Sequence, residues 1–368
     1  MSYVLTKMTD IIEFNPRETI ARKQVCKKVP MEYLQPFTRQ ISGFEEAPYA
    51  GGTKFRNNDT IMARITPCLE NGKTAFVKGF AENEVVFGST EYIVMRAIPG
   101  ASDPVFIYYL ATSPSFREVA IKSMVGSSGR QRVQQDVLEN LELVLPDYET
   151  QVRVGKVLSA FDDKIELNTQ INHNLEEQAK AIFDDMFPGI TDGDSCVGDI
   201  ITPKRGKSLL SKDAVPGDVP VIAGGLEPAT FHNVSNTIPP VLTISASGAN
   251  AGYVSLWTIP VWSSDSSFID SSMTGNVYFW YVLLKKRQKE IFDAQTGSAQ
   301  PHIYPQHIAQ MSLANISKQD IEAFTSTVKP IFDTIGENKK QNSRLAQLRD
   351  TLLPKLMSGE IDVSEVEI

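Results

Sequence analysis

A carboxylate-rich stretch comes nearest to a catalytic motif in this sequence. It consists of Pro146-Asp147 and, further along the chain, Asp162-Asp163-Lys164. Two carboxylates and a lysine resemble the group that holds metal ions in metal-dependent nucleases. Asp162 and Lys164, however, adjoin Phe161 and Ile165 in a helical apolar pattern, where charged flanking positions are expected. We therefore predict no catalytic residues and a protein that is not an enzyme.

The other reactive side chains are scattered along the chain. Cys26, Cys68 and Cys196 show no CxxC spacing, which argues against a zinc site and a disulfide framework. The only Pro-Pro pair, Pro239-Pro240, is not part of the Asn-Pro-Pro-Tyr or Asp-Pro-Pro-Tyr motif of adenine methyltransferases. The histidines form no metal-ligand or triad spacing: they are His173, His232, His302 and His307. We expect no metal, no cofactor and no methylation by the chain alone.

Charge is distributed unevenly along the chain. The net charge of −8 is unfavourable for binding DNA, because phosphate contacts need lysine and arginine. Residues 54–78 nevertheless carry five cations against only Asp59 and Glu70. The cations are Lys54, Arg56, Arg64, Lys73 and Lys78. A local positive field can matter more than the total charge.

The length and the composition indicate two folded domains and connecting elements. A chain of 368 residues exceeds the size of an ordinary single core. No run of about 20 apolar residues could cross a bilayer, and the N-terminal MSYVLTKMTDIIEFN lacks the apolar core of a signal peptide. We expect a cytoplasmic protein with no membrane role.

An internal repeat with an offset of about 170 residues organises the chain. Its first piece is a glycine-serine turn followed by spaced apolar residues. One copy has Gly126-Ser127-Ser128 and then Val133, Leu138, Leu141 and Leu143; the other has Gly297-Ser298-Ala299 and then Ile303, Ile308, Met311 and Leu313.

The second piece of the repeat is a long helical stretch with a heptad seam, whose apolar positions alternate by four and three. The first seam is Val154, Leu158, Phe161, Ile165, Asn168, Asn172, Leu175, Ala179, Ile182 and Met186. The second is Phe324, Val328, Ile331, Ile335, Asn338, Asn342, Leu345, Arg349, Leu352 and Leu356. Every position is offset by 170, so we predict two long helices that form an antiparallel coiled coil.

Each seam contains two asparagines, and one proline interrupts the second helix. Asn168, Asn172, Asn338 and Asn342 either hydrogen-bond across the helix pair and set its register, or are merely solvated. Pro330 should kink or restart the second helix, so its first turns are expected to form a separate segment. The stretch 154–186 would span roughly 48 Å, or about 14 base pairs.

A stretch rich in β-branched residues and turn signals precedes each helix. We predict strands at 60–65, 74–77 and 91–96 in the first stretch, and at 219–222, 241–245 and 252–254 in the second. Aromatic-rich helices are expected at 104–110 and 278–284. The fold class is therefore α+β, with two globular domains separated by two long helices in a pseudo-twofold internal repeat.

The two stretches also resemble a known protein family. The run NDTIMARITPCLENGK at 58–73, followed by GSTE at 88–91, resembles the first recognition domain of Type I restriction-modification specificity subunits (HsdS). The runs VLTISASGANAGYV at 241–254 and TGSAQP at 296–301 resemble a second such domain. The order of domain, helix, domain and helix matches the family over essentially the whole chain.

The resemblance implies a division into five segments. These are target-recognition domain 1 (1–146), a first spacer helix (147–188), target-recognition domain 2 (189–317), a second spacer helix (318–359) and a tail (360–368). Each domain would read one half of a bipartite double-stranded DNA target, and the helices would set the spacing. The implied partners are two methyltransferase (modification) subunits, which bind the helices and methylate adenine, and restriction/translocase subunits.

Sequence readout needs donors and acceptors on rigid loops, and phosphate contacts need cations. In domain 1 the candidates are Thr53, Lys54, Arg56, Arg64, Asn71, Lys73, Ser127, Arg130, Gln131 and Arg132. In domain 2 they are Lys204, Arg205, Lys207, Ser208, His232, Asn233, Ser247, Asn250, Gln300 and His302. Alternatively, Arg64 and Lys73 only solvate strand edges, and the glycine-rich 246–252 is a plain turn. Trp257 and Trp262 are expected to pack in the protein.

Two other functions remain open at this point. The acidic balance suits a coiled-coil scaffold or interaction protein that never reads DNA. The same architecture would also suit the specificity module of a related modification enzyme. The residues Glu176, Glu177, Lys180, Asp184 and Asp185 are either partner-facing or simply a solvated helix face.

Overall fold

The computed structural model describes residues 2–297 and 300–363. The chain forms two compact units, and the boundary between them falls near the middle of each long helix. Unit 1 comprises Met1–Leu167 and Gln341–Ile368, and unit 2 comprises Asn168–Lys340. The five-segment division stays a prediction; residues 364–368 of its tail and Ser298-Ala299 of the repeat lie outside the described residues.

The body of unit 1 contains two four-stranded sheets and a ribbon. The first sheet has the order β2 (Ile12–Phe14), β9 (Tyr92–Ala97), β6 (Thr60–Ala63) and β7 (Thr74–Phe76), all antiparallel. The second has the order β4 (Glu45–Pro48), β3 (Val25–Val29), β8 (Val86–Gly88) and β5 (Lys54–Phe55), in which β3 and β8 are parallel. β1 (Tyr3–Lys7) pairs with β10 (Glu142–Pro146) as an antiparallel ribbon.

Unit 1 also contains several short helices, of which α2 (Pro104–Thr112) packs on the first sheet. The helices are α1 (Met8–Ile11), α2, α3 (Pro114–Lys122), α4 (Gln135–Glu139) and the 3-10 turn Met31–Tyr33. Asp103 begins α2 by accepting a hydrogen bond from the Phe106 backbone N–H at 2.9 Å. Because α2 contacts β6, β7 and β9, nearly all of its residues are buried. The predicted helix at 104–110 is therefore present and two residues longer.

The body of unit 2 repeats this order of strands. Its main sheet has the order β12 (Lys204–Arg205), β18 (Ser266–Asp270), β15 (Val241–Ser245) and β16 (Val254–Trp257). A second sheet has the order β14 (Thr230–His232), β13 (Val219–Ile222) and β17 (Trp262–Ser263), and β11 (Ser195–Cys196) pairs with β19 (Ser312–Leu313). Its helices are α6 (Val277–Lys286), α7 (Gln288–Asp293), α8 (Pro305–Ala309) and the 3-10 turns Val197–Asp199 and Ser211–Asp213.

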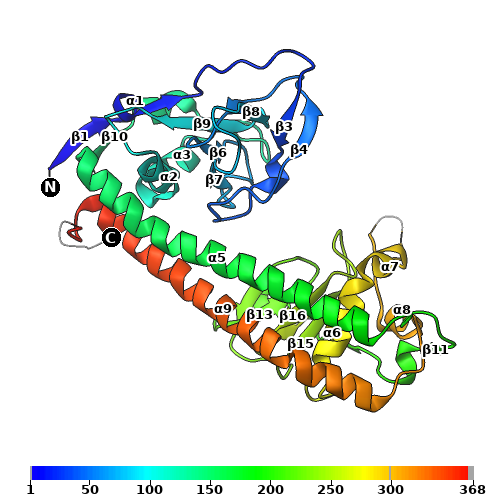
Figure 1. The fold of residues 1–368 in the computed structure, drawn as a ribbon. Helices are drawn as coiled ribbons and strands as arrows, with labels where there is room; N and C mark the ends of the chain where they lie inside the picture. The colour runs from blue at the N-terminus through cyan, green and yellow to red at the C-terminus, as the bar shows by residue number, and fades with distance from the viewer. Residues whose placement is uncertain (1, 298–299, 364–368) are drawn as a thin grey trace. The chain divides into compact units, whose positions relative to one another are not determined.

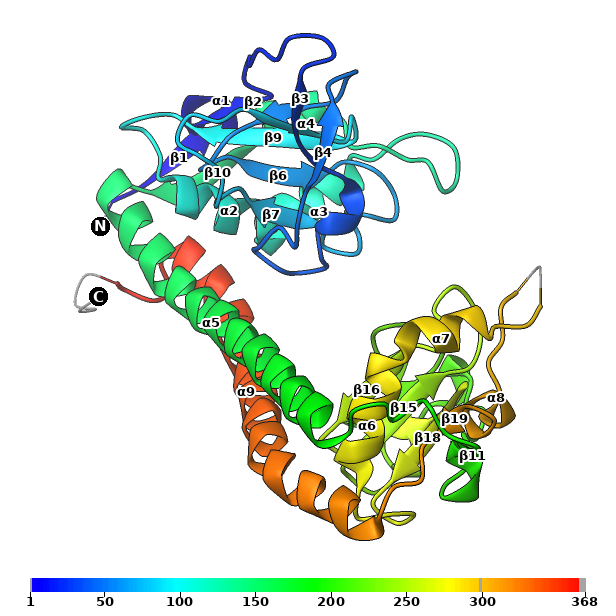
Figure 2. The same cartoon turned by 45° about the vertical axis from the view of Figure 1, so that its right-hand side comes forward.

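The two bodies therefore share one topology. Strand β9 lies between β2 and β6 in unit 1 as β18 lies between β12 and β15 in unit 2. The second sheet of each unit also holds one parallel pair, β3–β8 and β13–β17. Figure 2 shows β6, β7 and β9 side by side in unit 1, and β15, β16 and β18 with α6 beside them in unit 2. The internal repeat predicted from the seams is present in the fold.

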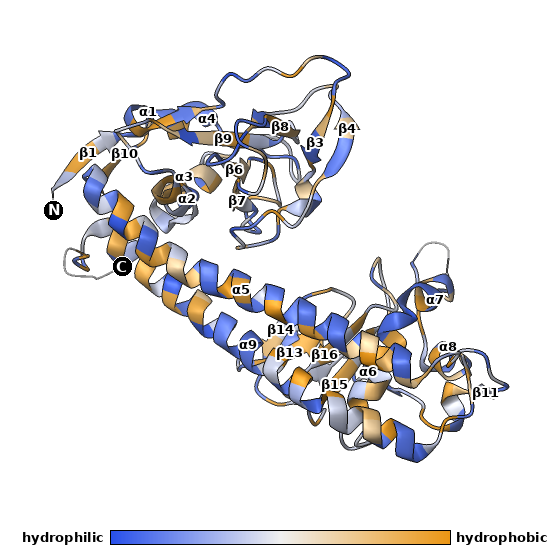
Figure 3. Ribbon diagram, viewed as in Figure 1, coloured by the Kyte–Doolittle hydropathy of each residue, from blue (hydrophilic) through white to orange (hydrophobic). Residues whose placement is uncertain are grey.

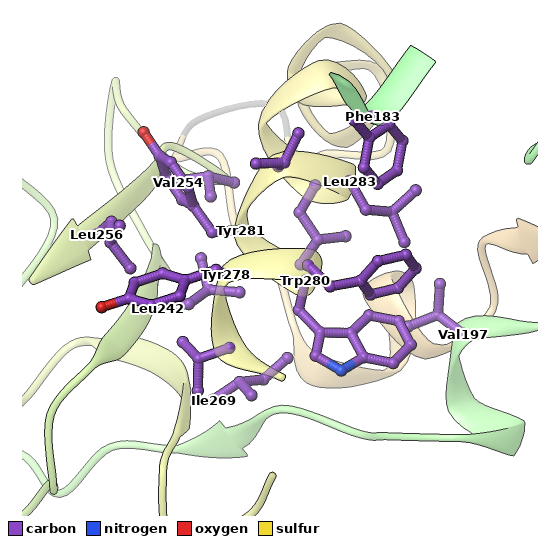
Figure 4. Close-up of a cluster of buried hydrophobic side chains, with 14 of the residues drawn as sticks. Phe183, Val197, Leu242, Val254, Leu256, Ile269, Tyr278, Trp280, Tyr281 and Leu283 are labelled. Atoms are coloured by element: carbon purple, nitrogen blue, oxygen red, sulfur yellow. The ribbon is translucent and has the colours of Figure 1, made fainter. Parts of the chain in front are cut away.

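Both faces of each main sheet are buried. In unit 1, Ile61 and Val94 face a core between the two sheets, whereas Met62 and Ile93 face a core that includes α2. This two-sided burial explains why β6 and β9 are apolar at nearly every position and do not alternate. In unit 2, Tyr278 and Tyr281 of α6 lie toward the sheet residues Leu242, Val254 and Leu256, and Trp280 and Leu283 lie toward Phe183 and Val197 (Figure 4).

Two long helices, α5 (Tyr148–Met186) and α9 (Lys318–Ser358), run through both units (Figure 1). All predicted seam positions are buried or half-buried, and along both helices hydrophilic and hydrophobic residues alternate (Figure 3). In unit 1, Asn342 Nδ2 lies 3.4 Å from the Ile165 carbonyl, and Arg349 pairs with Asp162 at 2.5 Å. Residue numbers rise along one helix as they fall along the other, so the helices are antiparallel within this unit.

The same antiparallel pairing occurs in unit 2. Asn338 Nδ2 donates to Asn172 Oδ1 at 2.8 Å, and the rings of Phe183 and Phe324 lie 5.3 Å apart. Asn168 and Asn172 are buried and Asn338 and Asn342 half-buried, so the solvated alternative is wrong for these four residues. That they set the register stays a prediction.

Two sequence predictions about local structure are wrong. Helix α9 continues through Pro330, and its first turns do not form a separate segment. A proline removes one backbone hydrogen bond, and burial of Phe324, Val328 and Phe332 on the same helix compensates for it. The strand predicted at 252–254 begins only at Val254, because Gly252 has a positive φ of 87° and belongs to the preceding turn.

Candidate nucleic-acid interface

Three segments of unit 1 meet at one end of its main sheet, and we name them the unit 1 corner: residues 64–66, 89–91 and 125–133. Arg132 forms isolated β-bridges with both Val125 and Ile65. The Arg64 N–H donates to the Glu91 carbonyl at 2.9 Å, and the Thr66 N–H donates to the Gln131 carbonyl at 3.0 Å. These backbone bonds hold the loop 126–132 beside the ends of β6 and β9.

Four of the predicted DNA-contacting residues of domain 1 lie on this loop, and a fifth lies beside it. Ser127, Arg130 and Arg132 are exposed and Gln131 is half-buried. Arg130 has no ion-pair partner among the residues of the described ranges. Arg64 is the fifth, and its Nε is buried without a hydrogen-bond partner in the described part of the chain.

Glu91 holds Arg132 through two parallel hydrogen bonds. Arg132 Nε donates to Oε2 at 2.9 Å and Nη2 donates to Oε1 at 2.6 Å. The hydrogen bonds from Arg132 keep the pKa of the Glu91 carboxyl below its ordinary value, so Glu91 is charged at neutral pH. The guanidinium remains about half exposed, at 45%.

Of the remaining predicted residues of domain 1, Thr53, Lys54, Arg56 and Lys73 bind within the protein, and Arg56 lies beside Asp59 at the opposite end of β6. Thr53 Oγ1 donates to the Ser89 carbonyl at 2.9 Å. Lys54 and Arg56 both reach Glu18, through its carbonyl and its carboxylate respectively. Lys73 donates to the Met31 carbonyl at 2.9 Å, and Asn71 is exposed. For Lys73 the geometry favours the structural alternative over a DNA contact.

The positive field predicted from residues 54–78 is weaker in space than along the chain. Arg56 is neutralised by Glu18, and Lys78 pairs with Glu166 of α5 at 2.9 Å. Both acids lie far from these cations in the sequence. At the corner, Arg130 is exposed and has no acid partner among the described residues, whereas Arg132 is paired with Glu91 and Arg64 is half-buried.

Unit 2 has a corner of the same construction, formed by residues 246–248, 264–265, 296–297 and 300–303. His302 forms isolated β-bridges with both Thr296 and Ser247, as Arg132 does with Val125 and Ile65. The Ala246 N–H donates to the Asp265 carbonyl at 3.1 Å, and the Ile303 N–H donates to the Ala246 carbonyl at 3.0 Å. The predicted residues Ser247, Gln300 and His302 lie here, and His302 stacks on Tyr304 with ring centroids 6.1 Å apart.

Asp265 occupies the place of Glu91 and also holds an arginine. Arg205 Nη2 donates to Asp265 Oδ1 at 2.5 Å, and the Ser247 hydroxyl bonds to the other carboxylate oxygen. Arg205 comes from β12 and not from the loop. Lys204, Lys207 and Ser208 flank it and are exposed.

The other predicted residues of domain 2 lie apart from the corner or inside the protein. His232 is 7% exposed, its Nδ1 accepts the Val215 N–H at 3.0 Å, and its ring lies edge-on to Trp262. This burial disfavours a DNA contact through the histidine ring. Asn233 is exposed beside it, and Asn250 is half-buried in the turn 248–253. Trp257 and Trp262 donate to Thr243 and Lys207 respectively, so both pack within the unit.

The sequence analysis missed several charged residues that the fold brings together. Glu91 and Asp265 were not among the candidates, because each acid is remote in sequence from its arginine. Asp162 was expected on a solvated helix flank, but it is 3% exposed and accepts hydrogen bonds from Tyr109 at 2.6 Å and Arg349 at 2.5 Å. The feature of the sequence that could have identified Glu91 and Asp265 is their position directly before β9 and β18.

Two further features of the described residues concern chemistry. No group of three or more histidine, cysteine or acidic side chains within residues 2–297 and 300–363 is arranged to hold a metal ion. Among the helices of those residues, none has both the length and the apolar character to cross a membrane.

Comparison with known proteins points to one family. Residues 3–177 match the model of the Type I restriction modification DNA specificity domain. The Type I restriction enzyme HindI specificity subunit of Haemophilus influenzae is 25% identical, covering 88% of this chain and 90% of its own. The MjaIX specificity subunit of Methanocaldococcus jannaschii is 24% identical, covering 71% and 70% respectively.

The fold agrees with this relationship. A crystal structure of the Type-I restriction-modification system S subunit from M. genitalium aligns with a TM-score of 0.54 at 18% identity, covering 97% of this chain and 96% of that one. Such a likeness concerns the fold alone. Residues 3–177 are thus similar to the Type I restriction modification DNA specificity domain, and the chain is similar over most of its length to Type I specificity subunits.

Proposed function

We propose that this chain is the DNA-specificity subunit of a Type I restriction-modification complex, in which each unit reads one half of a bipartite target. The observation that carries the proposal is the repeated corner. One topology occurs twice, and both copies place a donor-rich loop at the same end of the main sheet. Two similar readers on one chain suit a target of two separate halves.

The corners supply both kinds of contact that DNA recognition needs. Arg130 is an exposed cation without an acid partner among the described residues and suits a phosphate. Gln131 in unit 1 and Gln300 in unit 2 carry amides that can both donate to and accept from a base edge. The loops are held at their bases by backbone hydrogen bonds, which limits the conformational entropy lost on binding.

The paired helices would set the distance between the two half-sites and bind the partner subunits. Helix α5 has 39 residues and is therefore about 58 Å long. The proposed partners are two methyltransferase subunits and the restriction/translocase subunits, which would carry out all the chemistry on adenine and on the DNA backbone. The chain itself would be non-catalytic and would act in the cytoplasm.

The test is to map methylated adenine in cells that express this chain with its methyltransferase subunit. Cells that express the methyltransferase subunit alone are the control. We expect a bipartite motif whose methylation depends on the chain. Methylation that is unchanged without the chain, although the methyltransferase is active, would contradict the proposal and favour the scaffold alternative.

A further inference from the structure

The two units hold an acidic residue at an equivalent backbone position. Glu91 directly precedes β9, and Asp265 directly precedes β18, the strand with the same neighbours in its sheet. In both units the carbonyl of the acid accepts the N–H of the residue that follows the adjoining strand, Arg64 or Ala246. Backbone hydrogen bonds therefore establish the equivalence without reference to side chains.

Both acids hold a half-exposed arginine, but the two arginines come from different elements. Arg132 lies on the loop of unit 1, and its equivalent in unit 2 is His302. Unit 2 supplies Arg205 from β12 instead. If the pair were only inherited from a duplicated ancestor, the arginine would occupy equivalent positions in the two units. What the two corners share is a guanidinium that is bound by an acidic side chain, and the arginine comes from a loop in unit 1 and from a strand in unit 2.

The geometry leaves part of each guanidinium free to bind another group. Arginine has five N–H donors in a planar fork, and Glu91 occupies the Nε and Nη2 side of Arg132. Nη1 has no partner among the described residues, and the side chain is 45% exposed. Asp265 contacts Arg205 through Nη2, and that side chain is 42% exposed. A carboxylate that fixes the plane of the fork also orients its free edge.

We propose that Arg132 and Arg205 each read a guanine in the major groove of their own half-site, and that Glu91 and Asp265 are positioning residues that hold the guanidinium planes. The inference rests on the proposed function. An arginine edge matches the O6 and N7 acceptors of guanine, and this pairing is the commonest specific contact with DNA bases. An arginine fork can also bind a phosphate through two hydrogen bonds, and the test below distinguishes that contact from guanine readout.

Stability gives no competing reason for these pairs. Ion pairs between exposed side chains contribute little to folding, because water and salt screen the charges. Arg132 and Arg205 are 45% and 42% exposed, and their partners Glu91 and Asp265 are 23% and 36% exposed, so both pairs are reached by solvent. Substitutions at the four residues should therefore leave the unfolding midpoint of the full chain close to that of the wild type.

The test measures binding of the complex of this chain with its methyltransferase subunit to duplexes of the mapped target. Each guanine is replaced in turn by 7-deazaguanine, which removes N7 and leaves base pairing intact. For the wild type, we expect one guanine in each half at which this change weakens binding by about 10- to 100-fold. R132A should abolish the sensitivity in one half, and R205A should abolish it in the other.

Two further variants separate positioning from charge. E91Q and D265N keep the shape of the acid and remove its charge, so they should reduce the sensitivity in the same halves as R132A and R205A. R130A is the matched comparison, because Arg130 lies on the same loop with no acid partner in the described residues. As a proposed phosphate contact, its loss should weaken binding to all duplexes equally and leave the sensitivity to 7-deazaguanine unchanged.

Three outcomes would overturn the inference. The first is that no guanine in either half is sensitive, and the second is that the sensitivity persists in R132A and R205A. The third is that R132A weakens binding equally on all duplexes, which indicates a phosphate contact. Failure of the proposed function is distinguishable, because then no chain-dependent target would be found at all.

Discussion

The two units attach their bodies to the long helices with different chemistry. In unit 1 the contact combines an apolar cluster with buried ion pairs: Arg39, which is 5% exposed, pairs with Asp163 at 2.5 Å and Glu166 at 2.8 Å of α5. Beside it, Asp162 accepts from both Tyr109 of α2 and Arg349 of α9. Burial, and then the negative charge of Asp162, raise the pKa of the Tyr109 hydroxyl, so it stays protonated and donates.

In unit 2 the corresponding contact is aromatic. The ring of Phe183 on α5 lies 5.6 Å from Phe279 of α6 and 5.3 Å from Phe324 of α9. Tyr278 of α6 stacks on Phe332 of α9 with centroids 4.8 Å apart. The duplicated topology therefore constrains the backbone, whereas the side chains that fasten body to helix were free to diverge. A buried charge network requires particular partners, and an aromatic cluster requires mainly volume.

The largest expected effect is in the aromatic contact. Phe183→Ala should lower the free energy of unfolding by about 3–5 kcal/mol, because a buried ring leaves a cavity. Denaturant unfolding of the full chain measures this loss. Phe292→Ala is the matched control, since Phe292 is an exposed phenylalanine of the same unit and should change stability by less than about 0.5 kcal/mol. Equal losses for both variants would show that the cluster around Phe183 does not stabilise unit 2.

The ionic contact should respond to single and double substitution in opposite ways. Asp162→Ala leaves Arg349 buried without its main partner and should cost about 3 kcal/mol, the lower end of the usual range, because Asp350 still contacts the guanidinium. Replacing both Asp162 and Arg349 by leucine should restore most of this loss, since no buried charge remains.

Equilibrium unfolding of the two variants tests this difference. The surface variant Glu177→Ala, which breaks an exposed pair with Lys180, should be indistinguishable from wild type. A double variant that is less stable than Asp162→Ala would mean that the pair itself, and not the cost of an unpaired charge, stabilises unit 1.

The smallest expected loss of stability comes from removing the N-cap residues of the long helices. Asp147 caps α5 by accepting the Thr150 N–H at 3.0 Å, and Ser317 caps α9 by accepting the Asp320 N–H at 3.0 Å. Alanine at either position should cost about 1 kcal/mol at neutral pH. The hydrogen bond from the Ser2 backbone, followed by those from Thr150, lowers the pKa of the Asp147 carboxyl.

Because the folded-state pKa of Asp147 lies below its unfolded value, its charge stabilises the fold above pH about 4 and loses this effect as the pH falls toward the folded-state pKa. The stability difference between wild type and Asp147→Ala should therefore shrink in acid, whereas that for Ser317→Ala should not. Asp147→Asn keeps a capping group and removes the titration. A pH-independent difference for Asp147→Ala would show that its charge is unimportant.

Periodic apolar patterns made much of the fold predictable. The strands Val219–Ile222 and Val241–Ser245 have the predicted bounds, and both long helices end within two residues of the predicted segments. These elements follow from local spacing, which a sequence displays directly. Gly252 and Pro330 were misjudged because turn geometry and tertiary packing, respectively, outweighed local propensity.

The candidate site was less accessible to sequence reasoning. Loop residues such as Arg132 and His302 could be selected by type and by their place in the repeat. Their partners could not, because Glu91 and Asp265 come close to Arg132 and Arg205 only after sheet formation. The buried Asp162–Arg349 pair was missed for the same reason, although Arg349 stood out as a charged residue on an apolar seam.

The most direct test of the central claim, that each unit reads its own half-site, is methylated-adenine mapping with one corner altered at a time. The variants are Ser127→Ala with Gln131→Ala for unit 1, and Gln300→Ala with His302→Ala for unit 2, each expressed with the methyltransferase subunit. We predict that each variant relaxes the base preference in one half of the bipartite motif and leaves the other half unchanged. Loss of preference in both halves from either variant, or an unaltered motif from both, would contradict the account.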